Sequence, residues 1–369
     1  MLVLKNNGNK ACIGVLNYNT ETMLKLYTDK TFLTEVHRRH VFPLLFDLHF
    51  QKNTTLLNYY ELTDTIANCD IVVFPIDYNS FYKFNKAFKN LNDEAKKYKK
   101  RIWIYTSGDY GFTVYIPNSY NFRLGGFNSK LDSNTFILPS FINDPYKNVL
   151  KQSFLTLEKK TKPNIGFVGH SQSGLIKFVK EYLSYLKSNL KRKFENKLED
   201  KQTFYPSSIK RARYLGILTR NKKIDTDFIL RNNYRGGVKN KIEKEQSTKE
   251  FYENMYNSAY TFCSRGVGNF SVRFYETLAM GRIPVLLNTD CRLPLENKIK
   301  WEKHIVIIQE NKSNTLAQKI LEFHESKSNL EFQALQKSNR MLWETHLRRD
   351  AYFIKIHNSF INIENRNNV

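Results

Sequence analysis

Residues 256–294 read YNSAYTFCSRGVGNFSVRFYETLAMGRIPVLLNTDCRLP, and their pattern decides the fold. The apolar run Tyr260–Cys263 predicts a strand, and the loop SRGVGNF leads from it into a helix that begins at Ser271. Gly281 is placed to end that helix in a left-handed turn, and Ile283–Leu287 predicts the next strand. A strand, a helix and a second strand in this order form one unit of a parallel α/β sheet.

The loop between this strand and this helix has the chemistry of an anion site. Its glycines, among them Gly268, let the backbone approach a ligand closely. Asn269 or Ser271 can cap the helix, whose free N–H groups and dipole attract anions. Arg265 and Arg273 add positive charges that match phosphate oxygens in geometry. We therefore expect a nucleotide diphosphate to bind here without a metal ion or another cofactor.

Glu276 adds an acceptor to the same predicted helix. It follows Arg273 by three residues and so lies on the same face, where a carboxylate accepts hydrogen bonds from two neighbouring hydroxyls of a ribose or sugar. The spacing alone equally allows a surface ion pair between Arg273 and Glu276, with Gly281 as an ordinary helix stop.

The alternation of strands and helices continues in both directions from this segment. Further strands are predicted at Cys12–Leu16, Ile71–Pro75, Ile102–Tyr105, Ile165–His170 and Tyr214–Leu218, with a short one inside Thr135–Pro145. Helices are predicted at 81–100, Leu175–Leu190, Thr248–Asn257 and Asn329–Phe360. The sequence therefore predicts two successive α/β sheets.

The length of 369 residues fits two domains, and a polar, lysine-rich stretch at 151–163 separates the two series of strands. We expect a Rossmann-like domain over residues 1–155 and a second over 162–340. The closing helical segment, residues 341–369, is expected to cross back to the first domain.

The composition fits an anionic partner and equally fits a lysine- and asparagine-rich chain whose lysines are simply solvated. The net charge is +23, and such a surplus attracts nucleic acid, anionic membrane surfaces or phosphorylated and lipid-linked small molecules. The densest basic stretch, residues 187–223, holds 12 lysines and arginines against three acids, and a solvated helix face and loop explain it without any function.

The sequence also bears on location. No apolar run approaches the roughly 20 residues that cross a bilayer, and the first residues lack a signal-peptide pattern. The four cysteines are widely separated and lack metal-ligand spacing, which favours a reducing compartment. We expect a cytoplasmic protein whose contact with the inner face of the membrane is peripheral.

A family resemblance strengthens the interpretation of the central segment. The run SVRFYETLAMGRIPV at 271–285, with the preceding FCSRG and the following LPLENKIKWEKHIVII, resembles the C-terminal signature of the exostosin-type glycosyltransferases, family 47. Shorter segments, CDIVVFPID, KRIWIYTSGDYG, FILPSFINDP and KPNIGFVGH, resemble landmarks of bacterial members. The resemblance therefore extends over most of the chain.

This resemblance implies an α/β fold of the GT-B type, with two Rossmann-like domains facing each other across a cleft. It also implies inverting transfer of a sugar from a nucleotide-sugar donor, usually a UDP-sugar, to a glycan or lipid-linked acceptor in surface polysaccharide synthesis. The second domain would bind the donor. The residues expected around the donor are Arg220, Arg231, Arg265, Ser271, Arg273 and Glu276.

Inverting transfer requires a general base for the acceptor hydroxyl, and we expect it in the first domain. Asp109 is the first candidate because SGDYG follows a predicted strand at its carboxyl end, where ligands bind in open α/β sheets. Asp77 is the second by the same argument, although a loop aspartate also serves as a turn former or helix cap. His170 and Gly169, after the first strand of the second domain, are expected to line the cleft with Gly268 and Asn269.

Two incomplete motifs bear on other classes of function. The run GVGNFS at 266–271 lacks the third glycine of a dinucleotide fingerprint, and GHSQSG at 169–174 lacks the spacing of a nucleophile elbow. A dehydrogenase and a serine hydrolase are therefore disfavoured. A nucleic-acid-binding protein that uses its basic surface is the main alternative, and a transferase-like scaffold without turnover is another.

Overall fold

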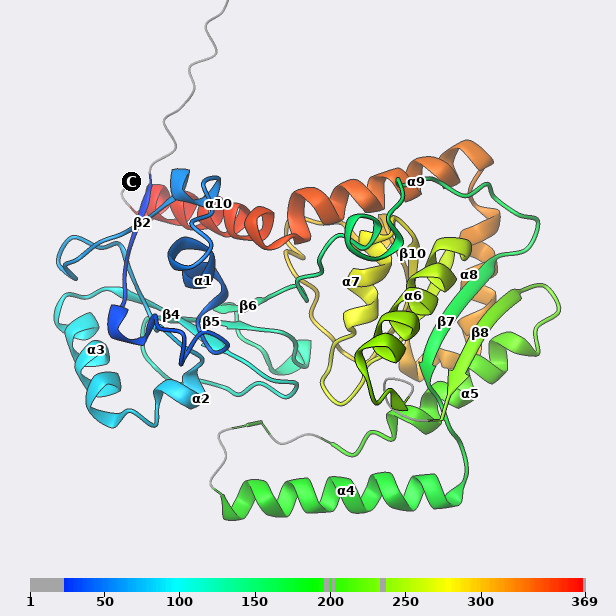
Figure 1. Cartoon of the computed structure of the whole chain (residues 1–369), viewed down its shortest axis with the longest axis horizontal. Helices are drawn as coiled ribbons and strands as arrows, with labels where there is room; N and C mark the ends of the chain where they lie inside the picture. The colour runs from blue at the N-terminus through cyan, green and yellow to red at the C-terminus, as the bar shows by residue number, and fades with distance from the viewer. Residues whose placement is uncertain (1–22, 196–198, 201–202, 233–236, 368–369) are drawn as a thin grey trace, which may run out of the picture.

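The computed structural model describes residues 23–195, 199–200, 203–232 and 237–367. Two parallel sheets, each flanked by helices, follow one another along the long axis of the molecule (Figure 1). This arrangement confirms the predicted pair of α/β sheets. The predicted strand Cys12–Leu16 lies outside the described residues.

The first sheet has the strand order β2-β1-β3-β4-β5-β6, and every neighbouring pair is parallel. Its strands are β1 (Leu24–Tyr27), β2 (Tyr60–Leu62), β3 (Ile71–Val73), β4 (Arg101–Thr106), β5 (Ser119–Arg123) and β6 (Thr135–Ile137). Its helices are α1 (Pro43–His49), α2 (Tyr78–Phe81) and α3 (Asn85–Lys97).

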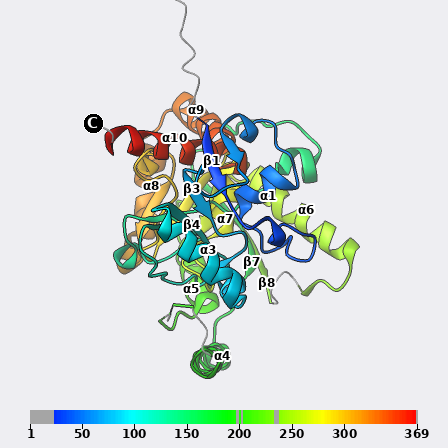
Figure 2. The ribbon, with the colours of Figure 1, turned by 90° about the vertical axis from the view of Figure 1, so that its left-hand side faces the viewer.

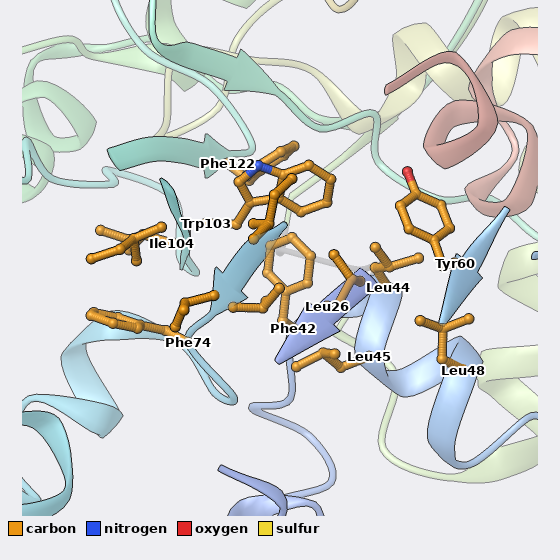
Figure 3. Packing of buried hydrophobic residues seen from close by; sticks show 14 of the residues in the cluster. Leu26, Phe42, Leu44, Leu45, Leu48, Tyr60, Phe74, Trp103, Ile104 and Phe122 are labelled. Atoms are coloured by element: carbon orange, nitrogen blue, oxygen red, sulfur yellow. The ribbon is translucent and has the colours of Figure 1, made fainter. Parts of the chain in front are cut away.

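The core of the first domain combines aliphatic and aromatic side chains, and Figure 3 shows part of it. The ring of Phe122 lies 5.3 Å from Phe42 and 5.1 Å from Trp103, centroid to centroid. Such edge-on and tilted contacts add to the stabilisation that burial of these large rings provides. The same core is completed from the far end of the chain, because Phe360 packs 4.8 Å from Trp103.

The second sheet has the order β11-β10-β9-β7-β8 and is also parallel throughout. Its strands are β7 (Asn164–His170), β8 (Asp225–Arg231), β9 (Tyr260–Cys263), β10 (Ile283–Asn288) and β11 (Val306–Gln309). Its helices are α4 (Leu175–Phe194), α5 (Ser207–Thr219), α6 (Lys241–Asn257), α7 (Val272–Ala279), α8 (Leu316–Glu325) and α9 (Asn329–Leu342).

One predicted strand of the second domain is wrong. Tyr214–Leu218 belongs to α5, where Tyr214, Leu215 and Leu218 are buried at helical spacing. Four apolar residues in a run of five are compatible both with a strand and with one buried face of a helix. The structure shows the helix, with its period of 3.6 residues. The strand in that part of the chain is β8, which begins at Asp225.

The last helix, α10 (Arg349–Asn367), leaves the second domain and packs on the first, as predicted. Figure 1 shows α9 and α10 following one another along one side of both domains. Tyr60 donates a hydrogen bond of 2.6 Å to the carbonyl of Phe353 in α10, and Arg349 donates one of 2.7 Å to the buried Asp47 in α1.

The carboxyl ends of the two sheets face each other through direct contacts between their loops. Asn269 donates to the carbonyl of Gly126 at 3.1 Å, and Asp290 accepts from Ser129 Oγ at 2.5 Å. This edge is where open α/β sheets bind ligands, so both domains contribute loops to one region. Among the described residues, no helix is long and apolar enough to cross a membrane.

Candidate functional site

Arg265, which follows β9, is buried between the two domains. Its guanidinium lies over the ring of Phe127 from the first domain at 5.3 Å and over Tyr205 at 4.6 Å. One of its nitrogens donates to the carbonyl of Val267 at 2.8 Å. These contacts fix the plane of the guanidinium, as cation–π stacking does, in the loop predicted to hold an anion.

Arg273, in the first turn of α7, extends beneath the end of β7. It donates to the carbonyl of Val168 at 2.7 Å and lies 4.2 Å from the ring centroid of Phe167. A Cβ added to Gly169 would lie 2.8 Å from its Nη2 atom. The absence of a side chain at Gly169, which was predicted to line the cleft, therefore provides the space for the guanidinium of Arg273.

Arg211 of α5 joins these two arginines, and the sequence analysis did not single it out. It donates to the carbonyl of His170 at 2.5 Å, to Ser264 Oγ at 3.2 Å and to the carbonyl of Arg265 at 3.3 Å. Arg211 thereby connects the ends of β7 and β9.

Arg231, at the carboxyl end of β8, is held by α6. It donates to the hydroxyl of Ser247 at 2.6 Å and forms an ion pair with Glu250. Its carbonyl lies 3.1 Å from Nδ1 of His170, so that His170 bridges the neighbouring strands β7 and β8. Among the described residues, four arginines on neighbouring strands and helices at the carboxyl edge of the second sheet form what is here called the arginine group: Arg211, Arg231, Arg265 and Arg273.

The arginine group concentrates positive charge in a partly dry environment. Burial, with a smaller contribution from the charge of Arg273, lowers the pKa of Arg211 to about 10. Burial also lowers the pKa of Arg273 itself, with a contribution from Arg231. The buried Nε atoms of Arg265 and Arg273 have no hydrogen-bond partner among the described residues. Mutually repelling guanidinium groups with unused donors are the arrangement that an anion would stabilise.

Glu276 is a partly buried acidic residue of α7 whose carboxyl group interacts with the charge of Arg273. Its carboxylate accepts a hydrogen bond of 3.5 Å from Tyr252, and burial raises its pKa to about 7, although Arg273 opposes the shift. The carboxylate therefore changes its charge in the neutral range, one turn along α7 from Arg273.

The first turn of α7 has no side-chain cap. Ser271 occupies the N-cap position without accepting a hydrogen bond from the helix. Asn269 does not cap it either, because its side-chain oxygen accepts from Thr289 Oγ1 at 2.6 Å and its amide nitrogen donates to the carbonyls of Gly126, Thr289 and Asp290. The N–H groups of α7 are therefore not used by either predicted cap. A small hollow beside this turn is lined by Arg265, Asn269, Ser271 and Tyr275, among other residues.

Arg220 does not join the arginine group. It is the exposed C-cap residue of α5 and precedes β8, whereas the arginine group lies at the carboxyl ends of the strands. The structure places the other predicted donor residues, Arg231, Arg265, Ser271, Arg273 and Glu276, in one region.

In the first domain, Asp109 lies on an exposed loop after β4. A Cβ added to Gly268 would lie 2.1 Å from the carbonyl oxygen of Asp109, so these two loops touch. Close backbone approach thus explains the glycine at 268. Asp109 is therefore positioned against the loop that bears Arg265.

Asp77 is placed differently from Asp109. Its carboxylate is buried, caps α2 through the N–H of Ser80 at 3.3 Å, and lies 3.0 Å from Nδ1 of His40. Asp77 thus has the capping role that a loop aspartate often has, and the half-exposed group beside it is His40. The sequence analysis missed His40, because nothing in its local sequence indicates a partner 37 residues away.

A larger hollow of about 560 Å³ lies on the first domain between the end of β1 and α3. Tyr27, Asp29, Lys86 and Glu94 are among its lining residues. It shares no lining residue with the arginine group, so the arginine group and its surrounding loops remain the candidate site.

Comparison with known proteins places the sequence in a family. The sequence matches the Exostosin GT47 domain over residues 62–322, more than half of the chain. Comparison with curated proteins gives no match. Among solved structures, a glycosyltransferase from Rickettsia africae ESF-5 is similar with a TM-score of 0.37 and 14% identity, covering 92% of this chain and 99% of that one. TarM is similar with a TM-score of 0.36 and 9% identity over 78% of this chain, which spans 54% of TarM.

Two facing Rossmann-like domains and this family match together define a glycosyltransferase of the GT-B type. The chain belongs to the exostosin GT47 family. The family resemblance noted in residues 271–285 is thereby confirmed.

Proposed function

We propose that this glycosyltransferase transfers a sugar, with inversion, from a UDP-sugar to a glycan or lipid-linked saccharide in surface polysaccharide synthesis. The observation that carries the proposal is the arginine group at the carboxyl edge of the second sheet, with unused buried donors on Arg265 and Arg273. In this proposal residues 162–340 bind the donor and residues 1–155 bind the acceptor. The protein acts in the cytoplasm, in peripheral contact with the inner face of the membrane.

The arginine group supplies what a departing nucleotide diphosphate requires. As the acceptor oxygen bonds to the anomeric carbon, the bond from that carbon to the diphosphate oxygen breaks, and negative charge accumulates on the diphosphate. Arg265 and Arg273, with the N–H groups of α7, stabilise that charge without a metal ion. Glu276, when ionised, accepts hydrogen bonds from the hydroxyls of the ribose.

Asp109 is the proposed general base. It belongs to the first domain and touches the loop of Arg265 across the domain boundary, so its carboxylate can take the proton of an acceptor hydroxyl bound between the domains. His40, oriented by the buried Asp77, is the competing base at the same edge of the first sheet.

Donor binding is tested by thermal unfolding in the presence of nucleotide sugars and free nucleoside diphosphates. A ligand at about 100 times its Kd stabilises the protein by about 2.7 kcal/mol, so binding is readily detected. We expect UDP and UDP-sugars to raise the Tm of the wild type and of Arg213→Ala, an exposed arginine on α5, but not of Arg273→Ala. If no nucleotide raises the Tm and oligonucleotides do so at low salt, the nucleic-acid-binding alternative replaces this proposal.

The general base is tested by single-turnover and steady-state kinetics. Asp109→Asn should lower kcat by about a hundredfold or more while UDP still raises the Tm. His40→Gln is the comparison variant. If His40→Gln shows that loss and Asp109→Asn does not, the pair of His40 and Asp77 provides the base instead.

A further inference from the structure

Helix α4 carries an apolar surface that the rest of the molecule does not cover. None of its residues, all of which are described, is buried. Six of them form one stripe at spacings of three and four, here called the α4 stripe: Ile176, Val179, Leu183, Leu186, Leu190 and Phe194. The exposed fractions are 75% for Ile176, 57% for Leu183 and 80% for Phe194. A contiguous exposed stripe of this kind marks a docking surface.

The position of α4 leaves the stripe accessible. Figures 1 and 2 both show α4 standing apart from the two domains, on the side of the molecule opposite α9 and α10. Its aromatic contacts with the body run through Phe204, whose ring lies 5.5 Å from Phe178, 5.2 Å from Tyr182 and 5.4 Å from Tyr185. These aromatic residues lie on one flank of the helix, beside the α4 stripe rather than on it.

The charges of α4 indicate what the stripe contacts. The helix contains six lysines and arginines and a single glutamate. Lys180, Lys187 and Lys191 recur at spacings of seven and four, so they form one line along the helix, and this line borders the stripe on the side of Ile176 and Leu183. A helix with an apolar face bordered by lysines lies in the interface of an anionic bilayer. The net charge of +23 favours the same surface.

The charges also disfavour a second copy of the chain as the occupant. If the stripe formed the seam of a paired helix, Lys180 and Lys187 would flank it on one side, with Tyr182 and Asn189 on the other. No acid stands at those positions to pair with the lysines. Lys193 would also interrupt the seam.

We infer that the α4 stripe is a membrane-docking surface that binds anionic lipid bilayers. This develops the peripheral contact proposed above and identifies the part of the chain that makes it. The helix begins just after the Gly169–Gly174 loop at the arginine group. Beyond its other end, Asp200 accepts from the N–H of Thr113 at 2.9 Å and pairs with Arg123 at 3.2 Å. A docked α4 therefore places both sides of the candidate site near the bilayer, where a lipid-linked acceptor is presented.

The test is flotation of the purified full chain with vesicles, in the absence of any nucleotide. The vesicles contain either phosphatidylcholine alone or phosphatidylcholine with phosphatidylglycerol. We expect binding to the anionic vesicles that weakens as salt is raised. The double variant Leu183→Gln with Leu190→Gln should lower this partition by on the order of tenfold or more for each leucine. Lys180→Gln with Lys187→Gln should lower it about fivefold for each lysine.

Matched controls lie on the opposite side of the molecule. Leu330→Gln with Met341→Gln removes two exposed apolar side chains from α9, and Lys337→Gln removes an exposed lysine from the same helix. Both should bind vesicles like the wild type. Leu183→Trp adds a reporter whose emission should shift to shorter wavelength with anionic vesicles, because the native tryptophans are buried elsewhere.

Three results would overturn the inference. The first is a wild type that does not bind anionic vesicles, and the second is binding that the α4 variants leave unchanged. The third is a protein that does not bind vesicles and instead uses α4 for another partner. That partner would be a second copy if Leu183→Gln with Leu190→Gln dissociates a wild-type dimer, and nucleic acid if Lys180→Gln with Lys187→Gln abolishes oligonucleotide binding. Because the vesicle assay needs no nucleotide, its failure is distinguishable from a failure of the proposed donor site.

Discussion

Arg211 is the residue whose importance the structure adds to the site. Its guanidinium is shared among the ends of β7 and β9, beside Arg273. We expect Arg211→Met to weaken UDP binding roughly tenfold to a hundredfold, because a hydrogen-bonding positive charge is lost from the anion site. Isothermal titration with UDP measures this, and Arg213→Met on the same helix is the control. If Arg211→Met leaves the affinity for UDP unchanged but lowers the Tm of the free protein, then Arg211 stabilises the loops and does not bind the diphosphate.

Glu276 should make stability depend on pH. Burial raises its pKa from 4.5 to about 7 in the folded protein, so between these values the folded state holds a proton that the unfolded state has released. Its contribution to stability is therefore fully present below pH 4.5 and decreases as the pH rises to about 7. We expect the Tm of Glu276→Gln, relative to wild type, to increase between pH 5 and pH 8. A difference that stays constant would place the carboxyl pKa near its ordinary value.

At this scale the sequence alone could propose much of the candidate site, because Arg265, Arg273 and Glu276 lie within one short segment. Arg211 was not predicted as a site residue, because the basic stretch that contains it was interpreted as a solvated surface. It shares one helical face with Tyr214, Leu215 and Leu218, so a period of 3.6 would have indicated both the helix and an inward-facing arginine. His40 meets Asp77 only through tertiary structure, so no sequence spacing could have predicted that pair.

At the scale of elements, the end of α7 should be sensitive to a single methyl group. Gly281 has φ of +64°, and a Cβ there would lie 2.4 Å from the ring of Phe154. We expect Gly281→Ala to lower the free energy of unfolding by about 2 kcal/mol or more. Denaturant titration followed by circular dichroism measures the loss.

Gly216 in α5 is the matched control for Gly281. It lies inside a helix, and an added Cβ would meet only the flexible guanidinium of Arg220, at 3.2 Å. Gly216→Ala should therefore be neutral or stabilise by about 0.5–1 kcal/mol. Equal destabilisation by both changes would contradict the role assigned to the left-handed turn at Gly281.

Strands with a clear hydrophobic pattern were predicted, and strands without one were missed. The strands β7, β9 and β10 were predicted because each contains a run of mainly apolar residues bounded by loop residues. The strand β8 was missed because DTDFILR begins with polar residues, although it pairs with β7 along its whole length. The strands β1 (LKLY) and β2 (YEL) were missed because each interrupts a short apolar run with a charged residue, whereas the equally short β3 (IVV) is entirely apolar and was predicted.

At the scale of the whole molecule, transfer depends on how closely the two domains approach. Gly268→Ala would insert a Cβ 2.1 Å from the backbone of Asp109 and force the facing loops apart. We expect this variant to lose more of its transfer activity than of its UDP binding, because Arg265 of the arginine group contacts the withdrawing first domain, whereas Arg211 and Arg273 are held within the second. Gly266→Ala in the same loop, where an added Cβ meets nothing within 4 Å, should behave like the wild type. Parallel UDP titrations and transfer assays distinguish the variants, and equal transfer by both would contradict this account.

The return of α10 to the first domain has a consequence for the order in which the protein is made. Phe353, Ile356 and Phe360 complete the core that β1 to β6 begin, yet the ribosome adds them only after the entire second domain. Domains generally fold during synthesis from the N-terminus onward. Here the first domain cannot complete its core until translation has passed residue 360, and until then the aromatic surface around Trp103 stays uncovered. Nascent chains stalled before α10 should therefore be the ones that chaperones and proteases recognise.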